Sequence, residues 1–397
     1  MPSYTARFCN SLKLVVVLSC AIVLFAIDIA NAQCPAPVVA GGLQGPIGIT
    51  QSNQGRLFVS ETGPDVVNSG RISIVDPDDG VRRTLLSGLP SGVGSIGDFS
   101  GPTGLFMRGR TLYVLIGEGN STLPGPFPGA ELPNPNPASP LFSSVLAIHI
   151  SAHTEAITTG FTLTAEQQQA LAEGETVTLS NGAGDKIKIE LIANFPDFVD
   201  NPNPNLPPTF VIHSNPFDLV VVGNQAFVTD GGLNLVYEVN IPTGAFSVLT
   251  TFPPIANPLP FGPPVVEAVP TGIAHFNGQL LVTLFRGFPF VPGSSVVEQV
   301  DPSTGAHSVL ISGLSSAIDV LPITSKGDTD YLVLQFSTNL LGGGLGSLLR
   351  FETPGSTPTV LAGCLITPTS MTLDEKTDTL YITELATGRV VSVPIVQ

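Results

Sequence analysis

Short apolar runs separated by turns follow one another along this chain, and the same order of runs recurs six times. Each copy has an entry triplet such as Pro-Thr-Gly, a short apolar strand, a turn, a second strand rich in β-branched residues, and usually an acidic residue. The copies begin at residues 46, 102, 216, 270, 317 and 368, which are 56, 114, 54, 47 and 51 residues apart. A repeat of about 50 residues with several short strands is typical of propeller blades. The pattern therefore predicts an all-β fold, a six-bladed β-propeller.

A second recurring phrase, a short strand that ends in a glycine turn, closes several copies. It occupies residues 83–89, 308–314 and 359–363. The last copy ends after three strands, and the missing phrase stands at residues 37–43 instead. We therefore expect four-stranded blades in which the N-terminal strand completes the last blade and covers its open edge. Because each blade buries its faces only against its neighbours, the core should be spread between the blades.

The longest interval contains a small insertion after the second blade, residues 151–214. Residues 164–174 open with threonine, have glutamine three residues later and close with glycine, which predicts a short helix. Residues 176–180 and 186–191 flank an Asn-Gly turn and predict a hairpin. Six blades are favoured, and a seventh blade within the insertion is the alternative.

Residues 1–32 stand apart from the repeats. Arg7 and Lys13 precede an apolar run over residues 14–27, and Ala30 and Ala32 supply the small residues that a signal peptidase requires. The run is shorter than the roughly 20 residues that span a bilayer. We expect a secretory signal peptide, a single propeller domain over residues 33–397, and an extracellular or periplasmic location without membrane attachment after cleavage.

Composition and charge limit the kinds of partner that the protein is expected to bind. The 42 glycines and 37 prolines among 397 residues fit a chain of many turns. The net charge of −16 repels nucleic acid and anionic membranes, whereas it favours solubility or the binding of cations. We therefore expect a monomer that does not bind nucleic acid.

Two cysteines, Cys34 and Cys364, remain once the signal is removed. In a secreted protein such a pair invites a disulfide. Cys364 follows the expected outer strand of the fifth blade, whereas Cys34 precedes that of the sixth. Such strands run parallel, so the two sulfurs would start from opposite faces, and a bond needs Cα atoms within about 7 Å. A Cys34–Cys364 disulfide is therefore the disfavoured alternative.

One face of the propeller should collect acidic residues, because the loops that enter each first strand and leave each second strand share a face. These acids are Glu61, Glu118, Asp218, Asp230, Asp319 and Glu384. A ring of carboxylates around the channel could hold Ca²⁺, which takes six to eight oxygen ligands, in a calcium-dependent lactonase or lyase. Recurrence at one repeat position favours instead acceptors for backbone N–H groups. We therefore expect no cofactor, with Ca²⁺ as the alternative.

The loop after the second strand of the fourth copy departs from the repeat. Arg286 stands where an acid recurs, and Phe288, Pro289 and Phe290 follow it. Prolines restrict a loop, and exposed aromatic residues beside arginine are typical of interface anchors. Arg286, Phe288 and Phe290 are therefore the predicted ligand-binding residues, with packing between blades or a salt bridge as the alternative.

Catalytic motifs are missing from the sequence. His213, His275 and His307 stand alone and are interpreted as turn or surface residues, and no zinc-binding spacing occurs. The chain also lacks the nucleophile elbow, the phosphate-binding loop and the dinucleotide fingerprint. These observations favour a non-catalytic module that binds a small molecule, a glycan or a protein, with the calcium-dependent enzyme as the alternative.

Three tracts occur in a characteristic order: residues 88–91 before 101–104, residues 214–219 before a Val-Thr-Asp strand, and residues 269–272 before 287–290. Together they resemble the ScyD/ScyE family, secreted proteins with NHL-like propeller repeats that are associated with scytonemin gene clusters. Residues 288–293 are the most family-specific part. The resemblance implies a six-bladed fold and export, and it brings no catalytic residue.

Overall fold

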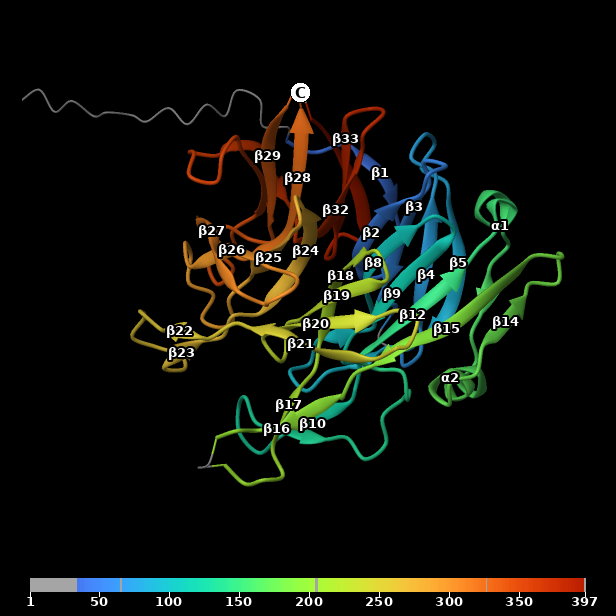
Figure 1. Cartoon of the computed structure of the whole chain (residues 1–397), viewed down its shortest axis with the longest axis horizontal. Coiled ribbons are helices and arrows are strands. Elements are labelled where there is room, and N and C mark those ends of the chain that lie inside the picture. The colour runs from blue at the N-terminus through green and yellow to red at the C-terminus, as the bar shows by residue number, and fades with distance from the viewer. Residues whose placement is uncertain (1–33, 65, 204–205, 326, 396–397) are drawn as a thin grey trace, which may run out of the picture.

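The computed structural model describes residues 34–64, 66–203, 206–325 and 327–395, and these residues build six blades around a central channel (Figure 1). The expected signal peptide, residues 1–32, lies outside the described residues. From the channel outward, blade 1 has strands β2 (Pro46–Gln51), β3 (Leu57–Glu61), β4 (Gly70–Val75) and β5 (Arg82–Leu89). Blade 2 has β8 (Pro102–Arg108), β9 (Thr111–Ile116), β12 (Ser144–His149), β15 (Lys186–Asn194) and β14 (Val177–Ser180). Blade 3 has β18 (Pro216–Val222), β19 (Gln225–Asp230), β20 (Leu235–Asn240) and β21 (Phe246–Thr251).

The second half of the ring repeats the same strand order. Blade 4 has β24 (Pro270–Phe276), β25 (Gln279–Leu284), β26 (Ser295–Val300) and β27 (His307–Leu314). Blade 5 has β28 (Ala317–Ser325), β29 (Asp328–Gln335), β30 (Gly346–Phe351) and β31 (Thr359–Leu365). Blade 6 has β32 (Pro368–Asp374), β33 (Thr379–Glu384), β34 (Arg389–Pro394) and β1 (Val38–Gly41). The six-bladed, four-stranded architecture is thereby confirmed.

Blade 6 is closed by the opposite end of the chain, as the sequence predicts. The strand β1 pairs antiparallel with β34, and Val38 lies opposite Val391. The first strands of neighbouring blades contact one another around the ring, so β2 also meets β32. Among the described residues, one cluster of buried apolar side chains fills each gap between neighbouring blades. The core is therefore divided among the blade interfaces.

The segment 151–214 is only partly an insertion, which corrects the expected boundaries. The predicted helix is α2 (Ala165–Ala172), and its Thr164 and Gln167 form a capping box. The predicted hairpin is β14 and β15, but β15 also pairs with β12 and is the fourth strand of blade 2. A further helix, α1 (Ala152–Ile157), and strand β13 (Phe161–Thr162) precede α2, and β13 adds to the outer edge of blade 1. These elements lie at the side of the ring (Figure 1).

A disulfide joins Cys34 to Cys364, with their Cα atoms 5.8 Å apart, so the argument against this bond is wrong. An outer strand that continued to the far face would keep the two sulfurs apart. Instead β1 has four residues and begins midway along β34. The Pro37 carbonyl still accepts the N–H of Ser392, but Ala36 is buried in the gap between blades 5 and 6. The chain thus turns toward blade 5 and brings Cys34 to β31.

The face that carries the loops into each first strand, here called the entry face, bears four extra hairpins. They are β6 (Gly92–Val93) with β7 (Phe99–Ser100), β10 (Thr122–Pro124) with β11 (Glu131–Pro133), β16 (Phe198–Asp200) with β17 (Val211–His213), and β22 (Ile255–Ala256) with β23 (Val265–Val266). Strands β10, β16 and β17 lie together at the lower edge of Figure 1. We call the first three hairpins the crown. It rises over blades 1 to 3.

Candidate functional site

Three of the six expected acids lie at one structural position and hold the backbone. Glu61, Asp230 and Glu384 each end the second strand of a blade, opposite the proline that begins the first strand. Each carboxylate accepts the N–H of a residue that precedes that proline: Gln44 at 2.5 Å, Asn215 at 2.8 Å and Ile366 at 2.7 Å. In blade 5 the amide of Gln335 accepts the N–H of Ser315 at 2.7 Å in the same way. The three acids and Gln335 therefore stabilise the entries of blades 1, 3, 6 and 5.

Asp218 and Asp319 lie in the channel, one tier away from the acids at the strand ends. Together with Gly48, Gly104, Gly272 and Ser370, one residue from each blade, they line a void of only about 10 Å³ in the channel. A Cβ on Gly104 would lie 2.6 Å from the Asp218 Cα, and one on Gly272 equally close to the Asp319 Cα, so glycine makes room for the acids. Burial, reinforced by the charge of Asp319, raises the pKa of Asp218, and burial raises that of Asp319 to about 7.

Each channel aspartate also joins two blades. Asp218 accepts the N–H of Ile273 at 3.0 Å, and Asp319 accepts that of Met371 at 2.8 Å. Below them the channel widens to a cavity of about 380 Å³ lined by the six first strands. The six expected acids therefore do not meet at one point. Among the described residues, no group of three or more His, Cys, Asp or Glu side chains is arranged to hold a metal ion.

Glu118 differs from the other acids because it lies two residues beyond the end of its strand. The position that matches Glu61 in blade 2 is Ile116, opposite Pro102. The Glu118 side chain is 1% exposed, and neither of its oxygens receives a hydrogen bond from a donor in the described part of the chain. Burial raises the pKa of Glu118 to about 8, although the charge of His213 opposes this shift. The side chain is therefore largely a neutral acid at pH 7.

His213 bridges two acids at the base of the crown. Its Nδ1 lies 2.8 Å from Glu131 Oε1, and its Nε2 lies 3.4 Å from Glu118 Oε2. Burial alone would lower the pKa of His213, but the hydrogen bond with Glu131 and the charges of Glu118, Glu131 and Asp230 raise it to about 9. The imidazole is therefore mainly cationic at pH 7. His213 was interpreted from the sequence as a turn or surface residue, and that interpretation is wrong.

Glu131 is the ionised member of this network. Its carboxylate also accepts the N–H of His213 at 3.0 Å and the hydroxyl of Ser95 at 2.6 Å. Burial favours the neutral acid, but these bonds prevail, so the pKa of Glu131 is lowered. Glu118, Glu131 and His213 come from three separate elements, since the loop after β9, β11 and β17 each contribute one residue.

The hairpin of β6 and β7 covers this network. A Cβ on Gly94 would collide with Glu118 Oε1 and lie 2.8 Å from Asp98 Oδ1, so the hairpin backbone lies directly against both carboxyl groups. Asp98 is within hydrogen-bond reach of Glu118, and burial raises the pKa of Asp98. The two acids can therefore share a proton.

A pocket of about 450 Å³ opens between this hairpin and that of β10 and β11. Ser95 and Ile96 line one side, and residues 124–131 line the other. Ile96 is 73% exposed and Phe127 is 45% exposed, and the Phe127 ring lies edge-on to Phe210, 5.5 Å between centroids. The pocket thus combines an apolar rim with the carboxylate of Glu131, in a size range usual for small-molecule sites.

Arg286 occupies in blade 4 the position that Glu118 occupies in blade 2. It lies two residues beyond Leu284, which ends β25. The side chain is 7% exposed, its Nε donates to the Ser294 carbonyl at 3.2 Å, and burial lowers its pKa. One terminal nitrogen of its guanidinium makes no hydrogen bond within the described residues.

The aromatic side chains beside Arg286 form a row on the entry face. Phe288 is 47% exposed, whereas Phe290 is half-buried. Their ring centroids are 6.0 Å apart, and Phe290 in turn contacts Phe285. Of the predicted ligand-binding residues, Phe288 therefore presents an open surface.

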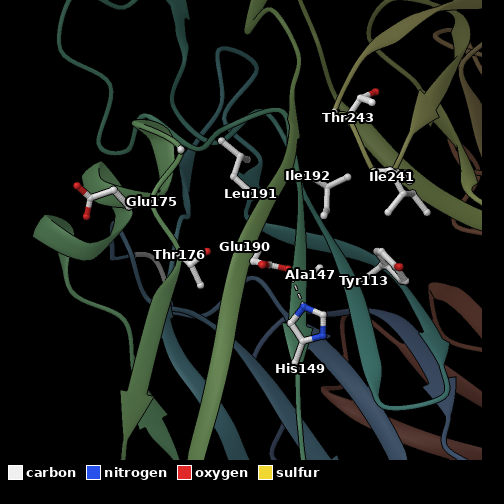
Figure 2. Close-up of a pocket in the computed structure, with 13 residues that line it drawn as sticks. Tyr113, Ala147, His149, Glu175, Thr176, Glu190, Leu191, Ile192, Ile241 and Thr243 are labelled. Atoms are coloured by element: carbon white, nitrogen blue, oxygen red, sulfur yellow. Dashed lines mark hydrogen bonds and ion pairs between the residues drawn. The ribbon is translucent and has the colours of Figure 1, made fainter.

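A second cleft, of about 440 Å³, lies between blades 2 and 3 (Figure 2). His149 and Glu190 face each other there at 2.8 Å, and Thr111 contacts the other imidazole nitrogen at 3.0 Å. Lys188 lies 2.5 Å from the second oxygen of Glu190. Because these polar groups satisfy one another, the cleft offers a ligand fewer free partners than the crown.

The structural likenesses of this chain to known proteins are distant. No family model and no curated protein matches the chain. The PQQ-bound aldose sugar dehydrogenase of Streptomyces coelicolor aligns over 90% of this chain and 96% of its own, with 14% identity and a TM-score of 0.47. A chain of a nidogen/laminin complex aligns over 83% of this chain and 92% of its own, with 11% identity and a TM-score of 0.40. Such likenesses carry no argument about function.

Proposed function

We propose that this protein is an exported, non-catalytic binding module that takes its ligand in the crown. The observation that carries the proposal is the Glu131–His213–Glu118 network beside an open pocket with an apolar rim. Buried titratable groups with shifted pKa values cluster at functional sites. Binding is favoured over catalysis because both Glu118 oxygens are buried, so no substrate atom reaches them in this conformation.

Export and family membership belong to the same proposal. The Cys34–Cys364 disulfide is typical of proteins outside the reducing cytosol. The six-bladed fold agrees with the resemblance to ScyD/ScyE proteins and their NHL-like repeats. No helix among the described residues is long and apolar enough to span a membrane. We propose a secreted monomer whose partner is a small molecule, a glycan or a protein.

The loop after β25 is the proposed second contact on the entry face. Arg286 and Glu118 occupy matching positions in blades 4 and 2, and each has a buried polar atom without a hydrogen-bond partner among the described residues. Phe288 supplies exposed aromatic surface beside Arg286.

A fragment screen by ligand-observed NMR tests the crown as the binding site. Fragments that bind the wild-type protein should lose binding to His213→Gln and Phe127→Ala variants. They should keep binding to His149→Ala, which changes the cleft between blades 2 and 3 instead. Fragment binding that survives both crown variants would refute the proposal, and chemical turnover of a bound fragment would indicate an enzyme.

A further inference from the structure

Carboxyl groups outnumber cations around Glu118. Asp98 from the turn between β6 and β7, Glu131 from β11, and Asp230 from β19 all act on it electrostatically, and His213 supplies the opposing positive charge. Asp230 is committed to the backbone, since it accepts the N–H groups of Asn215, Gly232 and Leu233. The remaining groups, three acids and one imidazolium, leave the site short of positive charge.

The second observation is that the buried Glu118 is poorly satisfied, with only the Nε2 of His213 at 3.4 Å and the carboxyl group of Asp98 near it. The two oxygens of Glu118 are unpartnered within the described residues, as are the nearby hydroxyls of Ser121 and Thr122. Buried polar groups are normally satisfied, so this concentration of unpaired oxygens indicates a missing donor. The exposed apolar rim beside these groups, Ile96 and Phe127, favours a donor carried on an organic body.

We infer that the crown pocket binds an organic cation, a protonated amine or amidinium on an apolar body, and that binding drives a proton out of Glu118. This inference rests on the proposed function. The cationic head pairs with Glu131 in the pocket wall, where it replaces the hydroxyl of Ser95. Glu118 does not line the pocket and is connected to Glu131 through His213. The apolar body lies against Ile96 and Phe127, whose exposure leaves room for it.

The proton balance follows from the charges. Before binding, Glu118 is mainly a neutral acid, because burial raises its pKa to about 8. A positive charge nearby favours the ionised form of a carboxyl group and lowers its pKa. The ligand keeps its own protons, Glu118 releases one to solvent, and no bond between heavy atoms forms or breaks. At pH 7 binding should therefore release up to one proton per ligand.

Three probes with the same apolar body separate the headgroup from the pocket: phenethylamine, 2-phenylethanol and phenylacetate. Titration calorimetry at pH 7 in phosphate and in Tris gives both affinity and proton release, because the two buffers differ in ionisation enthalpy. We expect the amine to bind at least about tenfold tighter than the alcohol, as a charge-assisted hydrogen bond allows. We expect no binding of the phenylacetate anion.

Variants assign the proton. Glu118→Gln should abolish proton release while the amine still binds, whereas the exposed Glu175→Gln should leave the proton count unchanged. The titration of Glu118 in the wild-type protein, followed by carbon NMR with and without amine, gives the same answer without a variant. Its pKa should fall when amine is added.

The outcomes distinguish this inference from the proposed function. If the amine and the alcohol bind the crown equally well, or no proton is released, the crown remains a binding site and the cation inference fails. If none of the probes binds and the fragment screen also finds no crown ligand, both fail. If proton release persists in Glu118→Gln, another group titrates and the role of Glu118 is refuted.

Discussion

Blades 2 and 6 each place a glutamate on the entry face, but the two side chains have different roles. Glu384 ends the second strand of blade 6, whereas Glu118 lies two residues beyond the end of the second strand of blade 2. Glu384 accepts the N–H of Ile366, the hydroxyl of Thr387 and the Nε of Arg389. Glu118 in blade 2 is equally buried but has none of these donors. Its nearest cation, His213, arrives from a hairpin outside the blade.

The difference distinguishes acidic side chains that stabilise the blades from side chains that are available for binding a ligand. A polar group that recurs at the end of the second strand, as in blades 1, 3, 5 and 6, stabilises the blade because it satisfies a backbone N–H group at the blade entry. A polar group that is displaced from that position is free of this task. In this protein the displaced groups are Glu118 and Arg286, and both lie where the entry face departs from the repeat.

The largest effect on the free energy of unfolding should come from removing the strand that closes blade 6. Deletion of residues 37–42 removes β1, leaves β34 as an open edge and separates Cys34 from Cys364. The disulfide alone is worth about 2 to 5 kcal/mol, so we expect a loss of at least about 5 kcal/mol in urea unfolding. Deletion of residues 257–262, the tip of the β22 and β23 hairpin, is the control of equal length. Equal stability of the two variants would contradict the closure.

A matched pair of substitutions tests the comparison directly. Glu384→Gln weakens a buried ion pair and should cost about 1.5 to 3 kcal/mol of unfolding free energy. Glu118→Gln removes an acid that must take up a proton to be buried at pH 7, so we expect no loss of stability at pH 7 and a gain of about 1 kcal/mol or more. Urea unfolding of both variants decides the point. A large loss with Glu118→Gln would show that Glu118 is also a structural acid.

The pH dependence of stability should carry the signature of the crown. The pKa of Glu118 is raised to about 8 from its ordinary 4.5, and that of His213 to about 9 from 6.5. In both cases the folded protein holds more protons than the unfolded chain between the two values, so its stability falls as pH rises. Unfolding midpoints should therefore decline from pH 6.5 to 9. Glu118→Gln should flatten the part below pH 8; an unchanged slope would contradict the shift.

A smaller effect on stability is expected at the loop of blade 4. Arg286→Ala and Phe288→Ala should move the melting temperature by no more than about 2 °C, since Arg286 makes one hydrogen bond and Phe288 is half-exposed. Binding of crown ligands large enough to span blades 2 to 4 should fall about tenfold. A large loss of stability would mark both residues as packing residues, and Arg286→Lys separates the charge from the shape.

The smallest effect should come from chelation. The acids on the entry face either hold backbone or lie in the crown, so the melting curve should be the same with and without EDTA. A fall of several degrees would instead support a calcium site and the enzyme alternative. Calcium added back to the chelated protein would be the control.

Much of the fold could be predicted because the strand pattern of one blade recurs six times in the sequence. The entry prolines, the closing phrase at residues 37–43 and the capping box at Thr164 are local patterns, and each has one physical interpretation. The fourth strand of blade 2 was assigned to the insertion because a long connection separates it from β12. Strands β12 and β15 are far apart in sequence, so the sequence does not reveal that they pair, although they are neighbours in the sheet.

The site could be predicted only in part, because its residues come from distant segments. Glu118, Glu131 and His213 share no motif, and the order of the hairpins alone brings them together. One signal was present: Glu118 stands two residues beyond the repeat position and Arg286 matches it. In sequence Glu118 resembles the recurring acids, so the offset becomes clear only from the strand pairing in the structure. The disulfide could not be predicted either. It forms because β1 has only four residues and Cys34 lies outside the sheet, and the sequence does not show where the pairing of β1 ends.

The closure of blade 6 also sets the order of events when the chain is made. Residues 34–41 are synthesised before any blade, yet β34 and Cys364, their partners, are among the last parts to follow. Strand β1 must therefore remain unpaired while blades 1 to 5 assemble. Contacts between such distant segments form slowly. The ring can close, and the disulfide can lock it, only after nearly the whole chain has emerged.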